Sequence, residues 1–397
     1  MKARYKYRFY PTITQQTNLA KMFGCSRVVW NDALAYCKSV DKIPKNGDLQ
    51  KWFITQAKKT DEREWLKEVC VTPLQQSIRD LGQAFSNHFK SLKGKRKGGI
   101  VGFPKFKKRS HSQSARFTGQ YFKVKQHSTY ISKVGNLKTV WSRPLPSEPS
   151  SVTVIKDASG RYFLSFVVEI EPDLIPAQHS SVGIDLGVST FATLSTGEKI
   201  GAPKPLNRNL RRLRTKQRKL ARKQKGSKRQ ERQRQQVAKT HARIKDIRTD
   251  FLHKLSTRLI CENQAIAIED LNVSGMLKNR KLSKAISDLG WYQFRTLLQG
   301  KATKYGREIQ VISRWEPSSQ TCSNCGKKGG KKHLSIRAWE CLNCGSWLDR
   351  DWNAAKNIKA VGGQSKAING RGGKCKSTLV AVASEASTSI KLESSRL

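Results

Sequence analysis

Four cysteines near the C-terminal end constrain the fold of this chain more than any other feature. They form two CxxC pairs with fifteen residues between them, and they are Cys322, Cys325, Cys341 and Cys344. Thiolates at this spacing complete a tetrahedral shell around Zn²⁺, because each CxxC turn places two sulfurs on one side of the ion. We expect a zinc ribbon over residues 316–345, in which protein fills all four ligand positions. Lysines beside the knuckle turns leave open whether the ribbon also contacts nucleic acid or is purely structural.

The other cysteines do not indicate a disulfide scaffold. Nine cysteines in 397 residues are too few for one, and four of them at metal-ligand spacing favour a reducing compartment. Outside the metal set, apolar or helical contexts indicate core or chance thiols for Cys25, Cys37, Cys70 and Cys261.

Basic residues dominate the composition. The chain has 77 Lys and Arg against 29 Asp and Glu, which gives a formal net charge of +48. Because like charges at this density repel one another, we expect a polyanionic partner. A membrane surface could also attract this charge, but no apolar run approaches the ~18 residues of a spanning helix and no signal peptide is recognisable. We therefore expect an intracellular protein of two or three domains.

The first part of the chain reads as a β-domain interrupted by helices. Alternation predicts a strand over 3–10, and helical spacing follows from Thr14. Short strands return after residue 101, at 121–126, 129–133, 151–157 and 162–171. We expect a small β-domain, in the form of a barrel, over 1–12 and 98–175, and a helical insertion over 13–97.

A second unit begins at residue 181, after a linker at 171–180. Residues 204–250 predict a basic helical hairpin with a thin leucine stripe and a turn at Gly226–Ser227. Its few acids cannot neutralise its Lys and Arg, so nucleic-acid contact is expected rather than a solvated helix pair covering the sheet. The segment 363–397 is rich in Gly, Ser, Thr and Ala and predicts a disordered tail.

Three acids stand where strand or helix ends would project them. Asp185 and Glu269 each end a run of alternating apolar residues, and Asp351 lies just inside a predicted helix that Asp349 could cap. Together they are the ligand types of a two-metal phosphodiester hydrolase, which holds two Mg²⁺ through hard oxygen ligands. Their spacing in the sequence does not by itself bring them together.

Eight stretches, in order, resemble the TnpB family, the RNA-guided nucleases carried by bacterial and archaeal insertion sequences and related to compact type V CRISPR effectors. The stretches are VGFPKFKK (101–108), GIDLGVSTFATL (183–194), DFLHKLST (250–257), IAIEDLNVSGM (266–276), SDLGWYQF (287–294), LLQGKATKYG (297–306), PSSQTCSNCG (317–326) and LDRDWNAAKNI (348–358). They span most of the chain between the helical insertion and residue 358.

The resemblance implies an α+β multidomain fold. It consists of an N-terminal wedge-like β-barrel with an inserted helical recognition bundle, then an RNase H-like (RuvC) nuclease domain over 181–315 and 346–362, interrupted by the zinc ribbon. The resemblance places the catalytic acids on Asp185, Glu269 and Asp351. Asp351 is preferred to Asp349 because of its position relative to the NAA that follows.

The resemblance also implies cofactors and partners. These are one structural Zn²⁺, two catalytic Mg²⁺, a guide RNA, and double-stranded target DNA beside a short adjacent motif. We expect a monomer with RNA at the nucleoid of a prokaryotic cytoplasm, with no membrane partner. Charge alone selects the candidate nucleic-acid contacts, which are Lys105, Lys107, Lys108, Arg109, Arg211, Arg212, Arg214, Lys278 and Arg280.

Three other functions stay open at this point. An RNA-guided repressor or transposition accessory protein would bind without cleaving, which the intact acid trio disfavours. A transposase could use the same acids, although no separate helix-turn-helix domain is recognisable. An RNA-binding protein of translation would match the charge and the ribbon but leave the three acids unexplained.

Overall fold

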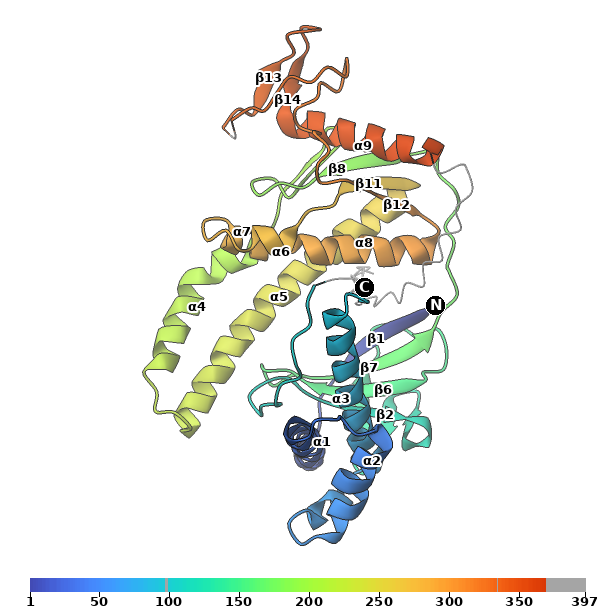
Figure 1. Ribbon diagram of the computed structural model, residues 1–397, viewed down its shortest axis with the longest axis vertical. Coiled ribbons are helices and arrows are strands. Elements are labelled where there is room, and N and C mark those ends of the chain that lie inside the picture. Colours follow the sequence, from blue (N-terminus) through green and yellow to red (C-terminus); the bar gives the residue numbers. More distant parts are fainter. Residues whose placement is uncertain (97–98, 334, 369–397) are drawn as a thin grey trace, which may run out of the picture. The chain divides into compact units, whose positions relative to one another are not determined.

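Each of two units of the chain is organised around a large β-sheet (Figure 1). The computed structural model describes residues 1–96, 99–333 and 335–368. The N-terminal unit comprises Lys2–Ile170, and the C-terminal unit begins at Glu171. The boundary lies five residues before the expected limit of the β-domain.

The N-terminal unit contains a seven-stranded antiparallel sheet in the order β2-β6-β7-β1-β5-β4-β3. Its strands are β1 (Lys2–Phe9), β2 (Gln113–Thr118), β3 (Phe122–Val124), β4 (Ser128–Ile131), β5 (Gly135–Val140), β6 (Ser151–Lys156) and β7 (Tyr162–Glu169). β1, β3, β4, β6 and β7 confirm the predicted strands, and β2 and β5 add two that were not among them. The order of the described strands has two ends, so closure into a barrel stays a prediction.

Along the chain, helices lie between β1 and the next strand, β2. They are α1 (Ile13–Ser39), α2 (Asn46–Gln50) and α3 (Val71–Leu92), with short helical turns at Lys51–Gln56, Ala57–Lys59 and Glu64–Glu68, and another at Gly119–Tyr121 after β2. A capping box starts α1, because the Thr12 side chain accepts from the Gln15 N–H and the Gln15 side chain accepts from the Thr12 N–H. Leu19, Phe23 and Leu34 are buried, so α1 packs one apolar face into the core of this unit, and the helical spacing predicted from Thr14 is confirmed.

The C-terminal unit is built on a five-stranded mixed sheet in the order β10-β9-β8-β11-β12. Its strands are β8 (Ser181–Asp185), β9 (Ala192–Leu194), β10 (Lys199–Ile200), β11 (Ala265–Glu269) and β12 (Glu308–Ile312), and a separate hairpin joins β13 (Ala338–Glu340) and β14 (Trp347–Asp349). β8, β11 and β12 run parallel, whereas β9 and β10 pair antiparallel. The central strands are therefore two parallel neighbours, β8 and β11.

Helices cover both faces of this sheet (Figure 1). They are α4 (Pro205–Ala221), α5 (Lys228–Glu262), α6 (Val273–Met276), α7 (Ser283–Leu289), α8 (Trp291–Tyr305) and α9 (Arg350–Ile368). Strand alternation decides which helix each residue meets: Ile266 and Ile268 belong to the core shared with α5 and α8, whereas Ala267 packs with Ile358 of α9.

Helix α9 lies unusually close to β8. A Cβ atom built on Gly183 would meet the Ala355 carbonyl oxygen at 2.1 Å and the Lys359 nitrogen at 2.5 Å. Because both atoms belong to the backbone, no side-chain rotation could relieve such a contact. A glycine at this strand position therefore sets the distance between the sheet and α9.

The predicted basic hairpin is formed by α4 and α5. Gly226 has a φ of +84°, and the Ser227 hydroxyl accepts from the Gln230 N–H at the start of α5, which confirms the turn. The expected end at residue 250 is wrong, since α5 continues to Glu262. Its last turns stay helical because Leu252, Leu255 and Leu259 are buried in the core of the sheet unit.

Other predictions have mixed outcomes. Cys25, Cys37 and Cys70 are buried, as expected of core thiols, whereas Cys261 is exposed on α5. Helix α9 continues to Ile368, into the segment expected to be disordered from 363, and the rest of that tail prediction lies outside the described residues. None of the helices within the described part of the chain is long and apolar enough to cross a membrane.

Candidate active site and metal centre

The carboxyl ends of β8 and β11 bring two of the predicted acids to one edge of the sheet. Ile184 pairs with Ile268, and the next residue in each strand is Asp185 and Glu269 respectively. Because the two strands are parallel neighbours, their last side chains emerge side by side at the same level. Helix α9, which packs on β8 and β11, contributes Asp351 from its first turn. We call these three residues the acidic edge.

Asp185 is affected both by burial and by the charges of the other two acids. Burial and the negative charges of Glu269 and Asp351 raise this pKa to about 8, against an opposing effect of Arg350. Burial also raises the pKa of Glu269, although the hydrogen bond from Ser318 opposes it. The charge of a divalent cation bound beside such carboxylates would offset both their repulsion and their desolvation.

Asp349 has a different role from Asp351. Its Oδ1 accepts from the Trp352 N–H at 2.9 Å, which confirms the predicted cap, and its Oδ2 lies 2.7 Å from the Lys199 Nζ. Burial opposes these contacts, but they lower the pKa of Asp349. Both oxygens of this carboxylate are therefore occupied within the protein, whereas Asp351 faces Arg337 only loosely, with 3.9 Å between its Oδ1 and the Arg337 Nη1.

Asp270, directly after Glu269, also serves the structure. It forms ion pairs with Arg295 of α8 and with Arg314 after β12, and both arginines lower its pKa. Two guanidinium groups on one carboxylate hold the chain where β11 ends. Asp270 therefore fixes the position from which Glu269 projects.

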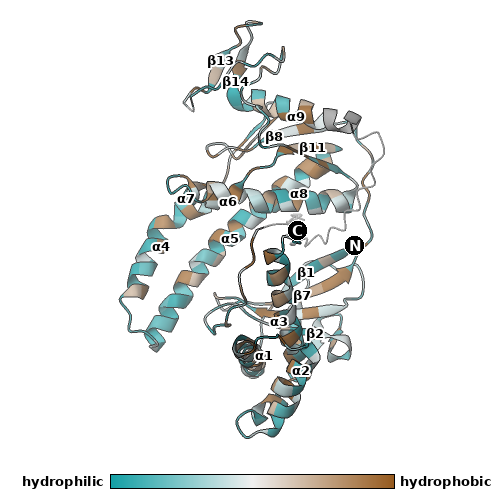
Figure 2. Cartoon of the chain, in the orientation of Figure 1, coloured by the Kyte–Doolittle hydropathy of each residue, from teal (hydrophilic) through white to brown (hydrophobic). Residues whose placement is uncertain are grey.

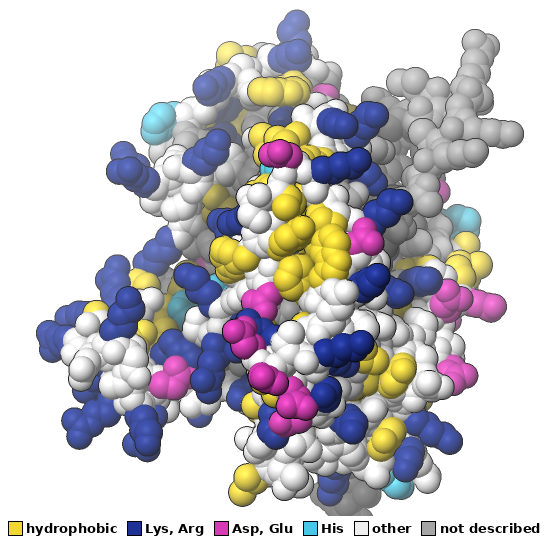
Figure 3. Space-filling view, turned by 60° about the horizontal axis from the view of Figure 1, so that its bottom comes forward, with side chains coloured by type: hydrophobic (Ala, Val, Ile, Leu, Met, Phe, Trp, Pro, Cys, Tyr) yellow, Lys and Arg dark blue, Asp and Glu magenta, His cyan; other side chains and the backbone are white. Residues whose placement is uncertain are grey.

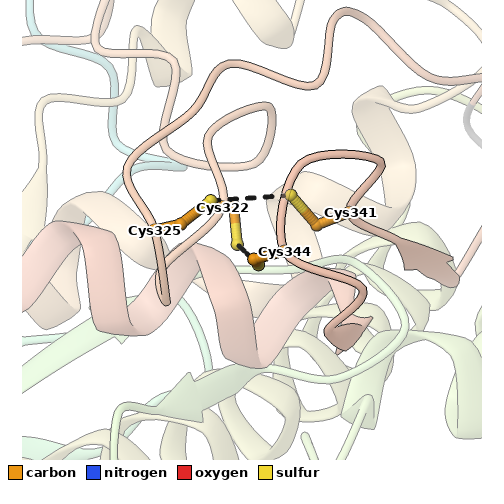
Figure 4. A group of neighbouring side chains, drawn as sticks. All are labelled: Cys322, Cys325, Cys341 and Cys344. Atoms are coloured by element: carbon orange, nitrogen blue, oxygen red, sulfur yellow. Dashed lines mark hydrogen bonds between the residues drawn. The ribbon is translucent and has the colours of Figure 1, made fainter.

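The four cysteines meet in one cluster, beside the β13–β14 hairpin (Figure 4). Their sulfur atoms all lie within 4.8 Å of one another, with Cys322 to Cys344 at 3.7 Å and Cys325 to Cys341 at 3.6 Å. A tetrahedral shell with Zn–S bonds of about 2.3 Å requires sulfurs about 3.8 Å apart, so this cluster fits the ion. Of the predicted metal ligands, these four are thus assembled as the sequence indicates.

Several residues around the acids were not predicted. The Ser318 hydroxyl donates to Glu269 Oε1 at 2.6 Å, and Asn353 and Asn357 of α9 donate to carbonyls of the same loop. A signal was available, because two asparagines four residues apart share one face of a helix and Ser318 lies just before the first CxxC pair. Neither residue type suggests catalysis by itself, so only the contacts identify them.

The charge-selected candidates have exposed side chains, but burial of the Lys107 ammonium lowers its pKa to about 8, so this lysine is the weakest candidate for a contact with nucleic acid. Helix α4 and the start of α5 are largely hydrophilic along their length (Figure 2), and Lys and Arg outnumber acids on the face in Figure 3. Exposed residues are Arg211, Arg212 and Arg214 on α4, Lys278 and Arg280 after α6, and Lys105, Lys107, Lys108 and Arg109 in the N-terminal unit. The Lys107 ammonium also lies 3.8 Å from the centre of the Trp30 ring.

Three protein-family models match separate parts of the chain. A model described as "Probable transposase" matches residues 165–280, and one described as "Cas12f1-like, TNB domain" matches 291–358, which includes the cysteine cluster and Asp351. A model described as "Helix-turn-helix domain" matches residues 1–40. These residues form strand β1 and the single helix α1, with no turn between two helices.

Relatives of known sequence extend over almost the whole chain. A Streptomyces pristinaespiralis protein named "Putative RNA-guided DNA endonuclease" is 44% identical over 91% of this chain and 90% of its own. An Escherichia coli protein with the same description, InsQ, is 31% identical over 90% and 92%, and a mimivirus "TnpB-like protein" is 26% identical over 90% and 72%.

An acidic edge on a mixed sheet and a nearby four-thiolate cluster define the class of protein, one in which neighbouring carboxylates are combined with four cysteines arranged as zinc requires. Because relatives that are 44% and 31% identical cover 91% and 90% of this chain, the chain belongs to the TnpB family.

Solved structures resemble the chain more distantly. The Cas12f1 chain of a Cas12f1–sgRNA–target DNA complex is 14% identical, with 90% of this chain and 98% of that chain covered and a TM-score of 0.48. A mini-RNA-guided endonuclease, CRISPR-Cas_phi3, is 8% identical, with 91% and 92% covered and a TM-score of 0.46. Both TM-scores are below 0.5, and the family assignment rests on the sequence relatives.

Proposed function

We propose that this protein is an RNA-guided DNA endonuclease that hydrolyses phosphodiesters at the acidic edge. The observation that carries the proposal is the position of Asp185 and Glu269 at the ends of two neighbouring parallel strands, with Asp351 in the first turn of the helix that packs on them. The names of the relatives, which are RNA-guided DNA endonucleases, support the choice of guide and substrate. The net charge of +48 suits a complex that holds many phosphates.

The arrangement of the C-terminal unit supports an RNase H-like, RuvC-type nuclease domain. Its three parallel strands and two antiparallel ones, in the order β10-β9-β8-β11-β12, place both strand-borne acids at one edge. We assign this domain to 181–315 and 346–362, the zinc ribbon to 316–345, and the wedge-like and recognition parts to the N-terminal unit. The protein would act on DNA at the nucleoid of a prokaryotic host.

The acids suit two Mg²⁺, and the thiolates suit one Zn²⁺. Carboxylate oxygens are the ligands that Mg²⁺ prefers, and a closed set of four thiolates leaves no open position for chemistry. When bound, the two Mg²⁺ supply activation of water and stabilisation of the leaving oxygen. The protein contributes the positions of the three carboxylates, which the sheet and α9 hold before substrate arrives.

The test begins with protein purified from cells that express its native locus, and with sequencing of the RNA that comes with it. The complex is then incubated with a plasmid library and Mg²⁺. We expect a discrete RNA and cuts that depend on its guide segment. Asp185→Ala should lower cleavage by at least about a thousandfold while RNA and DNA binding persist, because it removes an ion ligand and not a nucleic-acid contact.

Glu198→Ala serves as the matched control for this test. Glu198 is an exposed acid of the same unit, paired with Arg258, and its removal should leave cleavage unchanged. A specific RNA with tight DNA binding and no cutting would make the protein an RNA-guided repressor instead. Strand joining in place of simple cutting would make it a transposase, and the absence of any defined RNA would contradict RNA guidance.

A further inference from the structure

Ser318 links the acidic edge to the segment that carries the first CxxC pair. Its hydroxyl donates to Glu269 Oε1 at 2.6 Å, and the serine is 6% exposed. A short hydroxyl bond to one carboxylate oxygen fixes the rotation of the carboxylate and leaves the other oxygen for an ion. A hydroxyl has a single proton to donate, and Ser318 donates it to Glu269. Ser318 therefore influences the acidic edge through the orientation of the Glu269 carboxylate.

Two asparagines of α9 hold the loop that presents Ser318. The Asn357 side-chain amide donates to the carbonyls of Ser318 and Thr321, at 2.7 Å in each case. Asn353 donates to the same Thr321 carbonyl at 2.7 Å and accepts from the Ser323 N–H at 2.7 Å, and it is 1% exposed. A buried amide with both its donor and its acceptor satisfied has little freedom to move.

This network joins three features that are separate in the sequence. Ser323 follows Cys322 directly, and Asn353 lies two residues after Asp351 on the same helix. The loop 317–323 is therefore held at one end by the thiolate cluster, along its length by α9, and against Glu269 by the Ser318 hydroxyl. A displacement of the loop would move the Ser318 oxygen away from the carboxylate.

We propose that Ser318 is a positioning residue, which orients the Glu269 carboxylate for a divalent ion and derives its own position from the thiolate-anchored loop. The proposal rests on the proposed function, because it assumes that Glu269 ligates an ion. It deepens that function by assigning the cysteine cluster a task at the acidic edge. The cluster shapes the loop whose serine holds one of the acids.

The test measures Mn²⁺ binding to the full-length protein by electron paramagnetic resonance. The specific signal is the Mn²⁺ bound in excess of that bound by Asp185→Ala. Ser318→Val should weaken this binding about tenfold, as loss of a hydrogen bond behind a metal ligand typically does. Ser318→Thr should stay within about threefold of wild type, because it keeps the hydroxyl on a side chain of the same shape as valine.

The comparison of Ser318→Thr with Ser318→Val isolates the hydrogen bond, since any cost of the larger side chain is common to both variants. Ser319→Ala, at the neighbouring serine outside this network, is the control and should bind like wild type. Cleavage as a function of Mg²⁺ concentration should shift to higher concentration in Ser318→Val and little in Ser318→Thr. Equal Mn²⁺ affinity for the two variants would overturn the positioning role.

A failure of the proposed function would look different. In that case wild-type protein would bind no more Mn²⁺ than Asp185→Ala, and the acidic edge would not be an ion site. If wild type binds Mn²⁺ and cleaves DNA while both Ser318 variants match it, only the positioning role falls.

Discussion

At the residue scale, the central distinction is between two aspartates that are two positions apart. Sequence resemblance chose Asp351 over Asp349 by position in a motif, and the two carboxylates have different contacts in the structure. Asp349 caps α9 through the Trp352 N–H and pairs with Lys199, so its charge is already used. Asp351 lies two residues further along the chain, and its charge raises the pKa of Asp185 more than the charge of Asp349 does.

This distinction predicts opposite results for two matched substitutions. Asp351→Asn should abolish guide-dependent cleavage, because a neutral amide replaces a carboxylate ligand. Asp349→Asn should keep most of the activity, since asparagine is as good an N-cap as aspartate and only the exposed Lys199 pair, worth about 1 kcal/mol or less, is lost. Cleavage rates at saturating Mg²⁺ check both, and loss of cleavage in Asp349→Asn alone would reverse the assignment.

At the scale of elements, the packing of α9 on the sheet decides whether the third acid reaches the other two. The helix approaches β8 so closely at Gly183 that the Ala355 carbonyl occupies the place of a side chain. Asp351 belongs to the same rigid helix, so a shift of the helix axis would carry this carboxylate away from Asp185. The distance between sheet and helix is thus a condition for the acidic edge.

Gly183→Ala should therefore disturb both stability and activity. The added methyl group meets backbone atoms at 2.1 and 2.5 Å, and we expect the free energy of unfolding to fall by about 3 kcal/mol. Gly363→Ala in α9, whose Cβ would meet nothing within 4 Å, is the control and should stabilise the helix by about 0.5–1 kcal/mol. Denaturant unfolding and cleavage assays measure both effects, and a Gly183→Ala protein as stable as wild type would contradict the close packing.

At the scale of the whole molecule, positive charge dominates. The net charge of +48 is that of the whole chain, but the α4–α5 hairpin carries many exposed Arg and Lys on two adjacent helices, which are largely hydrophilic (Figure 2). Few hydrophobic residues hold the outer part of this hairpin, where Leu213 is buried and most neighbours are exposed. The outer part of this hairpin therefore has little apolar area to bury against the rest of the protein. Its exposed Lys and Arg form a surface suited to a polyanion.

We expect nucleic-acid binding to weaken steeply as salt rises from about 50 to about 200 mM, because binding releases counterions from the phosphates. Changing Arg211, Arg212 and Arg214 together to Gln should lower the slope of log K against log salt by about 2 to 3, close to one for each phosphate that is no longer neutralised. Fluorescence anisotropy with a labelled RNA measures the slope.

A charge-matched control separates local contact from net charge. Lys123, Lys125 and Lys138 are exposed residues of the N-terminal unit outside the candidate set, and changing them to Gln alters the net charge equally. If both triple variants lower the slope by the same amount, the hairpin is not a preferred contact.

The sequence by itself determined the chemistry and much of the local structure. Two CxxC pairs identify a thiolate site because cysteine spacing is a local property, and the alternation before Asp185 and Glu269 predicts strands because burial on one face repeats every second residue. The capping role of Asp349 and the turn at Gly226–Ser227 were also readable, since both depend on neighbours within a few residues.

Only the tertiary structure decided which distant residues meet. Strand order made β8 and β11 neighbours, close packing at Gly183 brought α9 to them, and the contact of Ser318 with Glu269 joins residues 49 positions apart. The sequence also did not predict that α5 ends at Glu262. Its leucines indicate which part of a long helix is buried, but they do not mark the residue at which the helix ends. Local patterns specify which groups are present, whereas their distances are set by how strands and helices pack.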